Sequence, residues 1–183
     1  MIRHLESRAG APLVHVQPPG TLRLTRAAEL LARKFRVVAL ELPASGDPAS
    51  AVTELMDALG TLGIHDFDLI SSSTASTAAL ALARAAGERV RALVLESPSP
   101  VEPRDAGLAT PTLIAFGTAD SGVTPETSRA FKSALTNSHL VFVYAAGAAI
   151  ADDRPEAFAD VVADFLERHE AFVISRAATV IHP

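Results

Sequence analysis

The fold of this chain is decided by the stretch FDLISSSTASTAALALA, which spans residues 67–83. Its first four residues form a short, nearly apolar run, which is typical of a strand buried on both faces of a sheet. From Thr74 to Ala86 the residues are small and apolar almost all round, as expected of a central buried helix. Because only a turn of serines separates the two segments, the stretch predicts a strand that leads directly into a buried helix.

Five further short apolar runs predict strands, and they lie at residues 12–16, 36–40, 91–95, 111–116 and 139–144. Segments of helical periodicity separate most of them, and these lie at residues 24–34, 49–62, 124–135 and 154–169. Because strands and helices alternate, we expect an α/β fold with a doubly wound, mostly parallel sheet and right-handed crossovers. Residues 2–7 predict an additional antiparallel edge strand.

The composition is that of a globular protein with a sizeable core. The chain has 183 residues, of which 49% are hydrophobic and 20% are charged. We assign residues 1–170 to a single domain and residues 171–183 to a C-terminal tail. Two interpretations of the tail stay open. Either residues 172–174 finish the last helix and the remainder frays, or the tail forms an extra strand or arm that packs on a partner subunit.

Charge and residue content exclude several functional classes. The net charge is −5 and there is no basic run, which argues against nucleic acid and anionic membrane surfaces as partners. Cysteine is absent, and no cluster of His, Asp or Glu has metal-ligand spacing. No glycine-rich phosphate loop follows the first parallel strand. We therefore expect no metal ion and no cofactor.

The sequence also predicts a cytoplasmic location. The N-terminus, MIRHLE, lacks the long apolar stretch of a signal peptide. No uninterrupted apolar run approaches the ~20 residues of a membrane span. Arginine outnumbers lysine and alanine is abundant, a codon-usage pattern that indicates a GC-rich bacterial genome.

The stretch around Ser73 resembles the strand–elbow–helix of α/β-hydrolases. The family pattern G-x-S-x-G maps onto Ser71, Ser73 and Ala75, which places Ser73 at the nucleophile position. The run GTAD at residues 117–120 is similar to the turn that carries the family's catalytic acid, which places Asp120 in that role. The resemblance covers nearly the whole chain and implies an α/β-hydrolase-like fold.

The chain departs from the family at the position of the general base. In α/β-hydrolases a His in the loop after the last strand accepts the proton of the nucleophile. The matching run here is YAAGAAI at residues 144–150, and Ala148 occupies the position of the base. It is followed by RPEAF at residues 154–158, which resembles the opening of the family's last helix. An alanine cannot take a proton, so the resemblance implies a hydrolase scaffold without its base.

Three histidines follow Asp120 and are candidates for a relocated base, because the family's chain order is Ser, Asp, His. They are His139, His169 and His182. We expect the first at the wrong end of the sheet, the second on a solvated face at the end of the last helix, and the third in the tail. His15 lies inside a predicted strand, where a buried, hydrogen-bonded structural role is expected.

The loop after the first parallel strand departs as well. In the family this loop supplies one backbone N–H to the oxyanion hole, but here it reads VQPPG at residues 16–20. Because proline has no N–H, two potential donors are missing. Losing one oxyanion donor costs on the order of 3 kcal/mol of transition-state stabilisation. Either the Gln17 side-chain amide replaces the donor, or the prolines only form a rigid turn. Thr74, directly after the nucleophile position, is the other oxyanion or cleft residue.

The region that in many α/β-hydrolases holds a cap domain is short. Only residues 97–110 follow the strand that ends near Glu96, and they contain three prolines and no helical pattern. We expect no cap domain, and therefore an open groove unless a second subunit covers it. Asp152 and Asp153 are expected to act as charges and caps at the start of the last helix.

Three functions are compatible with these residues. The first is a non-catalytic α/β-hydrolase-like protein, a pseudoenzyme that binds a small ligand, a protein partner or a second copy of itself as a homodimer. The second is a serine esterase or thioesterase in which Ser73 is activated by a relocated base. The third is a flavodoxin-like binding protein that shares only the fold class, and it predicts that Ser73 does not lie on a sharp elbow.

Overall fold

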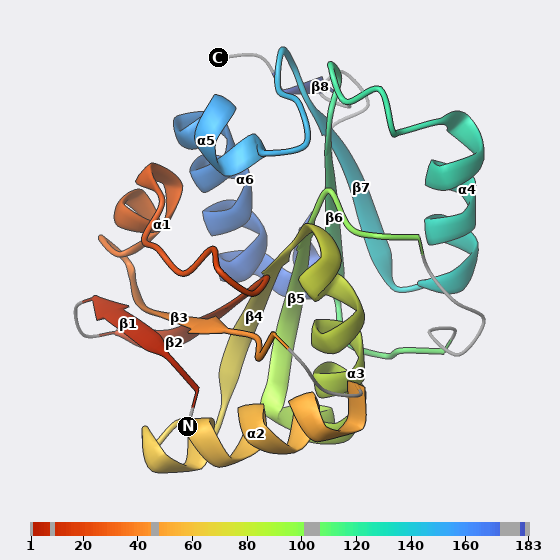
Figure 1. The fold of residues 1–183 in the computed structure, drawn as a ribbon. Helices are drawn as coiled ribbons and strands as arrows, with labels where there is room; N and C mark the ends of the chain where they lie inside the picture. Colours follow the sequence, from red (N-terminus) through yellow and green to blue (C-terminus); the bar gives the residue numbers. More distant parts are fainter. Residues whose placement is uncertain (1, 8–9, 45–47, 101–106, 173–179, 182–183) are drawn as a thin grey trace.

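The computed structural model describes residues 2–7, 10–44, 48–100, 107–172 and 180–181. Eight strands form one sheet (Figure 1): β1 (His4–Ser7), β2 (Ala11–Gln17), β3 (Phe35–Glu41), β4 (Phe67–Ser72), β5 (Val90–Glu96), β6 (Thr112–Gly117), β7 (Ser138–Val143) and β8 (Val180–Ile181). The α-helices are α1 (Arg26–Leu31), α2 (Pro48–Thr61), α3 (Ser76–Ala86), α4 (Pro125–Ala134), α5 (Ile150–Asp153) and α6 (Pro155–Arg168). Short 3-10 turns are η1 (Ser73–Ala75), η2 (Gly87–Arg89) and η4 (His169–Ala171).

The strand order is β1-β3-β2-β4-β5-β6-β7-β8. Among the strands of the described residues, β1 alone is antiparallel, at the edge beside β3, and the other pairings are parallel. The order reverses direction between β2 and β4, because β3 lies on one side of β2 and β4 on the other. In open α/β sheets such a switch point leaves a crevice at the carboxyl ends of the strands, where ligands bind. The predicted doubly wound, mostly parallel α/β sheet is confirmed.

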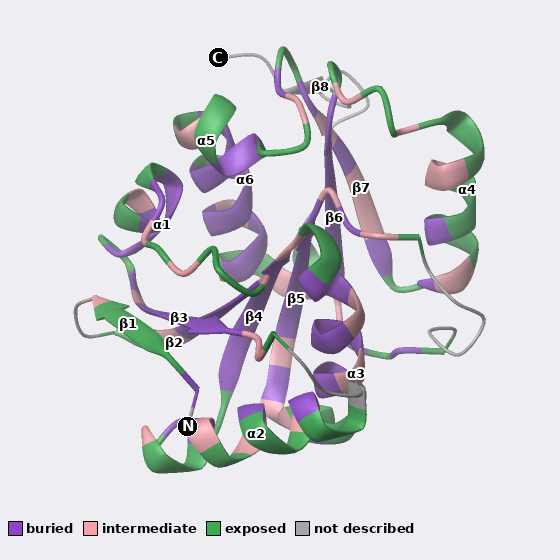
Figure 2. Cartoon of the chain, in the orientation of Figure 1, coloured by how far each residue is buried: buried purple, intermediate pink, exposed green. Residues whose placement is uncertain are grey.

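Helices cover both faces of the sheet. One core cluster joins α1, α5 and α6 to the first face, and a second cluster joins α2, α3 and α4 to the other. Strands β4, β5 and β6 are buried along nearly all of their length between these layers (Figure 2). Burial on both faces explains why these strands are nearly continuous apolar runs without alternation.

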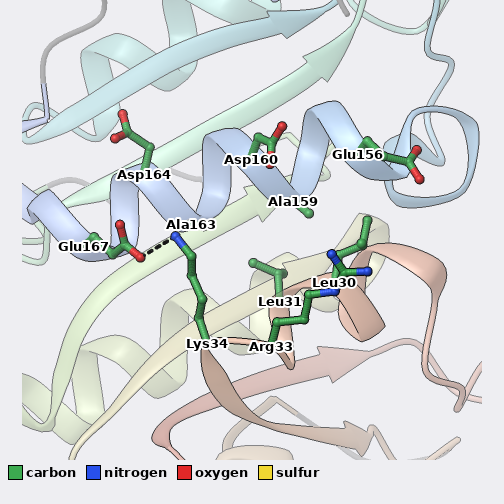
Figure 3. Close-up of a pocket in the computed structure, with 10 residues that line it drawn as sticks. All are labelled: Leu30, Leu31, Arg33, Lys34, Glu156, Ala159, Asp160, Ala163, Asp164 and Glu167. Atoms are coloured by element: carbon green, nitrogen blue, oxygen red, sulfur yellow. Dashed lines mark hydrogen bonds and ion pairs between the residues drawn. The ribbon is translucent and has the colours of Figure 1, made fainter.

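Helices α1 and α6 pack against each other on the first face. Between them lies a hollow of about 350 Å³ with the small side chains of Ala159 and Ala163 on one side (Figure 3). The Lys34 ammonium donates to the Glu167 carboxylate at 2.6 Å across the hollow, which ties the end of α1 to the end of α6. Because both side chains are about half exposed, this ion pair adds little to stability.

Several boundaries differ from the sequence-based expectations. Helix α6 ends at Arg168, and a positive φ of 47° at His169 ends it before Phe172, which therefore does not finish the helix. Phe172 is buried instead between His139 and Phe165, with ring centroids 5.2 and 5.4 Å away. Strand β8 pairs with β7, so it extends the sheet of its own chain. The rest of the tail lies outside the described residues, and its packing on a partner stays a prediction.

The connection between β5 and β6 spans only residues 97–111, which is too short to hold a helical cap domain. Among the described residues, no helix is both long enough and apolar enough to span a membrane.

Gly117, the last residue of β6, permits a close backbone approach that positions the loop carrying Ala148. The Ala119 N–H donates to the Ala146 carbonyl at 2.8 Å, so the loops after β6 and β7 run side by side. A Cβ atom at position 117 would meet the backbone carbonyl oxygens of Ala146 and Gly147. These are backbone atoms and cannot turn aside as a flexible side chain does.

We expect Gly117→Ala to destabilise the fold by about 3 kcal/mol, because the two loops must move apart. Gly60→Ala is the matched control. A Cβ at that position in α2 meets nothing within 4 Å, so the change stabilises the helix by about 0.5 kcal/mol. Urea denaturation of both variants measures the difference. Equal stabilities would show that the two loops do not approach closely at Gly117.

Candidate functional site

A cleft of about 420 Å³ opens at the switch point, above the carboxyl ends of β2, β4 and β5. Its lining combines hydroxyl, amide and charged side chains with several alanines. The lining residues are His15, Gln17, Pro18, Thr21, Arg23, Thr25, Ser72, Ser73, Thr74, Glu96, Ala148, Ala149, Ala151 and Asp152. Sequence reasoning placed Ser73, Thr74, Gln17 and Ala148 at one site, and the structure brings these four together.

Ser73 lies on a sharp turn between β4 and α3. Its φ of +50° is in the left-handed region, which costs a residue with a side chain on the order of 1 kcal/mol or more. Ser71 and Ala75 on either side are completely buried, so small residues are needed where strand and helix approach. This is the geometry of a nucleophile elbow, and it is opposite to what the flavodoxin-like interpretation predicts.

The polar side chains beneath the elbow form a chain of hydrogen bonds. His15 Nε2 lies 2.9 Å from Ser72 Oγ. Ser72 Oγ in turn lies 2.7 Å from Glu96 Oε2, and Glu96 Oε1 accepts the backbone N–H of Ala151 at 2.7 Å. Because these residues come from β2, β4, β5 and α5, the chain ties together the strand ends that carry the elbow.

The orientation of the Gln17 side-chain amide determines which atom donates and which accepts in each of these hydrogen bonds. Gln17 Oε1 accepts the Arg23 N–H at 2.9 Å and Gln17 Nε2 donates to the Arg23 carbonyl at 2.8 Å, so the amide cannot be flipped. The other Nε2 proton therefore points to His15 Nδ1, 3.2 Å away. With Nδ1 accepting, the neutral imidazole carries its proton on Nε2 and donates it to Ser72 Oγ. The Ser72 hydroxyl then donates to Glu96.

Burial keeps the imidazole neutral. It lowers the pKa of His15 from 6.5 to about 4, with a smaller contribution from the Arg23 charge. Because the unfolded chain binds this proton more tightly, the stability contributed by neutral His15 is present at pH 7. It is lost as the pH falls from about 6.5 to about 4. Burial also raises the pKa of Glu96, and the hydrogen bonds from Ala151 and Ser72 offset this in part.

The loop after β2 is held by Glu41, the last residue of β3. Glu41 Oε1 accepts the N–H groups of Gly20 at 2.8 Å and Leu22 at 3.4 Å, while Oε2 pairs with Arg3 at 2.9 Å. These two backbone N–H groups donate to the Glu41 carboxylate and are therefore not available to a ligand in the cleft.

The remaining donors of this loop are also used. Pro18 and Pro19 have no N–H, and the Thr21 N–H donates to the Pro18 carbonyl at 3.3 Å. With Gly20 at φ +76°, residues 18–21 have the pattern of a type II turn, as the rigid-turn interpretation predicts. Both amide protons of Gln17 are engaged as well, so Gln17 lines the cleft but has no free proton for an oxyanion. Within the described residues, the elbow N–H of Thr74 has no acceptor.

No described histidine is hydrogen-bonded to Ser73. The His139 ring packs edge-on against Phe165 and Phe172, at the start of β7. His169 was expected on a solvated face, but its Nε2 atom is buried 3.6 Å from Asp68 Oδ1, near the start of β4. The expectation holds only in part, because the side chain is 36% exposed but its Nε2 atom faces the buried carboxylate of Asp68 at the amino end of the sheet. His182 lies outside the described residues.

Asp120 lies in the turn after β6 and its side chain stabilises that turn. Its Oδ1 atom accepts the N–H of Gly122 at 2.9 Å, and Asp120 is not part of the cleft lining. Asp152 and Asp153 are acidic residues of the first turn of a helix, as expected, but the helix is α5, and neither residue caps α6. Asp152 forms an ion pair with Arg23 at the cleft rim, and Asp153 accepts the Gly147 N–H at 2.7 Å.

Sequence reasoning missed Ser72 and Glu96 as site residues. A signal for them exists: β2, β3, β4 and β5 each end in a polar residue after a nearly apolar run. These residues are Gln17, Glu41, Ser72 and Glu96. Within the described part of the chain, no group of three or more His, Asp and Glu side chains is placed to hold a metal ion.

We expect Ser72→Ala to cost about 2 kcal/mol or more of unfolding free energy, because it leaves the His15 N–H without an acceptor and the Glu96 Oε2 atom without a donor. Ser73→Ala is the matched control, since the Ser73 hydroxyl is exposed and makes no hydrogen bond to the described residues. It should change stability by no more than about 0.5 kcal/mol. Chemical denaturation at pH 7 compares the two. Equal effects would mean that Ser72 does not bridge His15 and Glu96.

Comparison with known proteins gives structural relatives only. No protein-family model matches the sequence, and no curated protein is significantly similar to it. Among solved structures, the α/β hydrolase enzyme MGS-MChE2, from a sediment metagenome of the lagoon of Mar Chica, superposes with a TM-score of 0.76 and 21% identity. That superposition covers 91% of this chain and 95% of the other.

Two further relatives give the same result. A predicted CIB-like hydrolase from Thermoplasma acidophilum superposes with a TM-score of 0.74 and 17% identity over 91% of this chain and 98% of that one. A thermophilic esterase from Thermogutta terrifontis superposes with a TM-score of 0.77 and 17% identity, over 92% of this chain and 94% of the esterase chain. Likeness at these identities establishes the fold, and the chain therefore has the α/β-hydrolase fold, without a cap domain.

Proposed function

We propose that this protein is a non-catalytic member of the α/β-hydrolase fold that acts by binding a small ligand in the cleft. One observation carries the proposal. The elbow serine has no hydrogen-bonded base among the described residues, and the position that matches the family's base is Ala148, which lines the same cleft. A serine hydroxyl is a weak nucleophile at neutral pH unless a base within about 3 Å receives its proton.

Among the described histidines, the one that contacts the elbow region does not replace that base. His15 contacts Ser72 rather than Ser73, and its Nε2 atom already carries a proton. Its lowered pKa also makes it a weak proton acceptor at neutral pH. The imidazole therefore donates a hydrogen bond to Ser72, the residue before the elbow serine.

The loop on the other side of the cleft also favours binding over catalysis. All of its backbone N–H groups from Gly20 to Arg23 donate to protein acceptors. The N–H of Thr74 is then the one elbow donor in the described part of the cleft, and a single donor stabilises an oxyanion poorly. An open cleft of about 420 Å³ is sufficient for a small molecule.

A serine esterase or thioesterase with a relocated base is the second candidate. It is favoured by the strained φ of Ser73, since strain of this kind is concentrated at functional sites. In this case Ser73 would need a base from outside the described residues, such as a group of a partner subunit. A protein partner in place of a small ligand, homodimer formation, a bacterial origin and a cytoplasmic location stay predictions, and light scattering of the purified chain checks the dimer.

A serine-reactive fluorophosphonate tests the proposal. We expect no adduct at Ser73 under conditions that fully label a catalytic serine hydrolase, because no base raises the nucleophilicity of the hydroxyl. Intact-protein mass spectrometry followed by peptide mapping measures the adduct. Rapid labelling that Ser73→Ala abolishes, and that the folded control Ser128→Ala leaves unchanged, would contradict a non-catalytic function.

A further inference from the structure

Three carboxylates in the described part of the chain are buried, and they differ in their partners. Glu41, Asp68 and Glu96 are 8%, 2% and 4% exposed. Two of them pair with arginine: Arg3 lies 2.9 Å from Glu41, and Arg91 lies 2.8 Å from Asp68. Burying a carboxylate without a counter-charge is costly, and these two follow the usual pattern of buried charges.

Glu96 has no cationic partner among the described residues. Its two oxygens accept one hydrogen bond each, both at 2.7 Å, from the Ala151 N–H and the Ser72 hydroxyl. Both donors are neutral. The arginine in the same cleft, Arg23, is paired with Asp152 at the rim. Because a carboxylate has about four acceptor positions, Glu96 retains capacity for further donors.

Glu96 is one of the residues that line the cleft, although only 4% of it is exposed, so a ligand in the cleft lies beside a carboxylate that has no cationic partner among the described residues. The same lining also includes Ala148, Ala149 and Pro18, which offer small apolar surfaces. Anionic ligands are disfavoured there when Glu96 is ionised, because Glu96 and Asp152 then contribute two negative charges and Arg23 only one positive charge. A ligand with a positive charge and a short apolar part matches both surfaces.

We propose that the cleft binds a small organic cation, such as an alkylammonium, whose charge pairs with Glu96 and whose apolar part packs on Ala148 and Ala149. The proposal rests on the proposed function that this site binds rather than cleaves. The ligand supplies the counter-charge that arginine supplies to Glu41 and Asp68.

The same pairing makes binding depend on pH. Burial raises the pKa of Glu96, so a larger fraction of the side chain is ionised as the pH rises. The other groups that face it are Asp152, the Arg23 guanidinium and neutral His15. Binding of tetramethylammonium, whose own charge does not titrate, therefore strengthens as the pH rises through the pKa of Glu96.

The test uses three probes of similar size and different charge: n-butylammonium, 1-butanol and butyrate. Chemical-shift titration of the folded protein measures the affinity of each and identifies the residues that respond. We expect n-butylammonium to bind at least about tenfold more tightly than 1-butanol, with shifts at Glu96, Ala148 and Ser72. Butyrate should bind most weakly.

Two variants of equal charge locate the effect. Glu96→Gln keeps the shape of the side chain and should remove the preference for the cation, whereas Glu54→Gln removes an equal charge from the exposed face of α2 and should leave it unchanged. If Glu96→Gln does not fold, the probe series and the pH dependence of tetramethylammonium binding in the wild-type protein still decide the question.

The outcomes separate this inference from the proposed function. Equal binding of the three probes, or binding that Glu96→Gln does not alter, would overturn the cation site and leave a non-catalytic binding protein in place. Labelling of Ser73 by the fluorophosphonate would overturn the proposed function, whichever probe binds.

Discussion

The hydrogen-bond chain Gln17–His15–Ser72–Glu96 is the constraint on which the cleft depends. It links the carboxyl ends of three parallel strands at the point where the strand order reverses, which is where the sheet alone would leave a crevice. Its direction is fixed at one end by the backbone of Arg23, so the protons are not free to rearrange. In a buried network each hydrogen bond is strengthened by its neighbours. When every donor and acceptor is satisfied, the network holds its side chains in one conformation.

The chain of hydrogen bonds explains how the elbow at Ser73 is held in place although no described residue is hydrogen-bonded to it as a base. The sharp turn at Ser73 requires small neighbours and firmly held strand ends, and both are present. Activation requires more: a base beside the hydroxyl and donors aimed at the oxyanion. Here the imidazole donates to Ser72, and the loop after β2 directs its N–H groups to Glu41 and Gln17. These polar groups of the cleft donate to acceptors of the scaffold itself, which is consistent with the proposed non-catalytic function.

The fold could be predicted from local patterns, because strands buried on both faces leave an apolar run and helices between them leave a 3.6-residue period. The loss of the base is predicted from the run that holds Ala148, and it stays a prediction. The role of Glu96 could not be predicted. Its partner Ser72 lies 24 residues away, and the contact depends on the register of β4 against β5. The expectation for His169 holds only in part for a related reason, because the burial of its Nε2 atom depends on where α6 ends relative to Asp68.

The protonation state of His15 tests the central claim most directly, since this imidazole is the one described histidine side chain that contacts Ser72, beside the elbow serine. Nitrogen-15 NMR of the labelled protein identifies which ring nitrogen carries the proton and follows it with pH. The structure predicts a neutral ring at pH 7 with the proton on Nε2 and a pKa of about 4. A proton on Nδ1, which would leave Nε2 free to accept a hydroxyl proton, together with titration near the ordinary value of histidine, would contradict it.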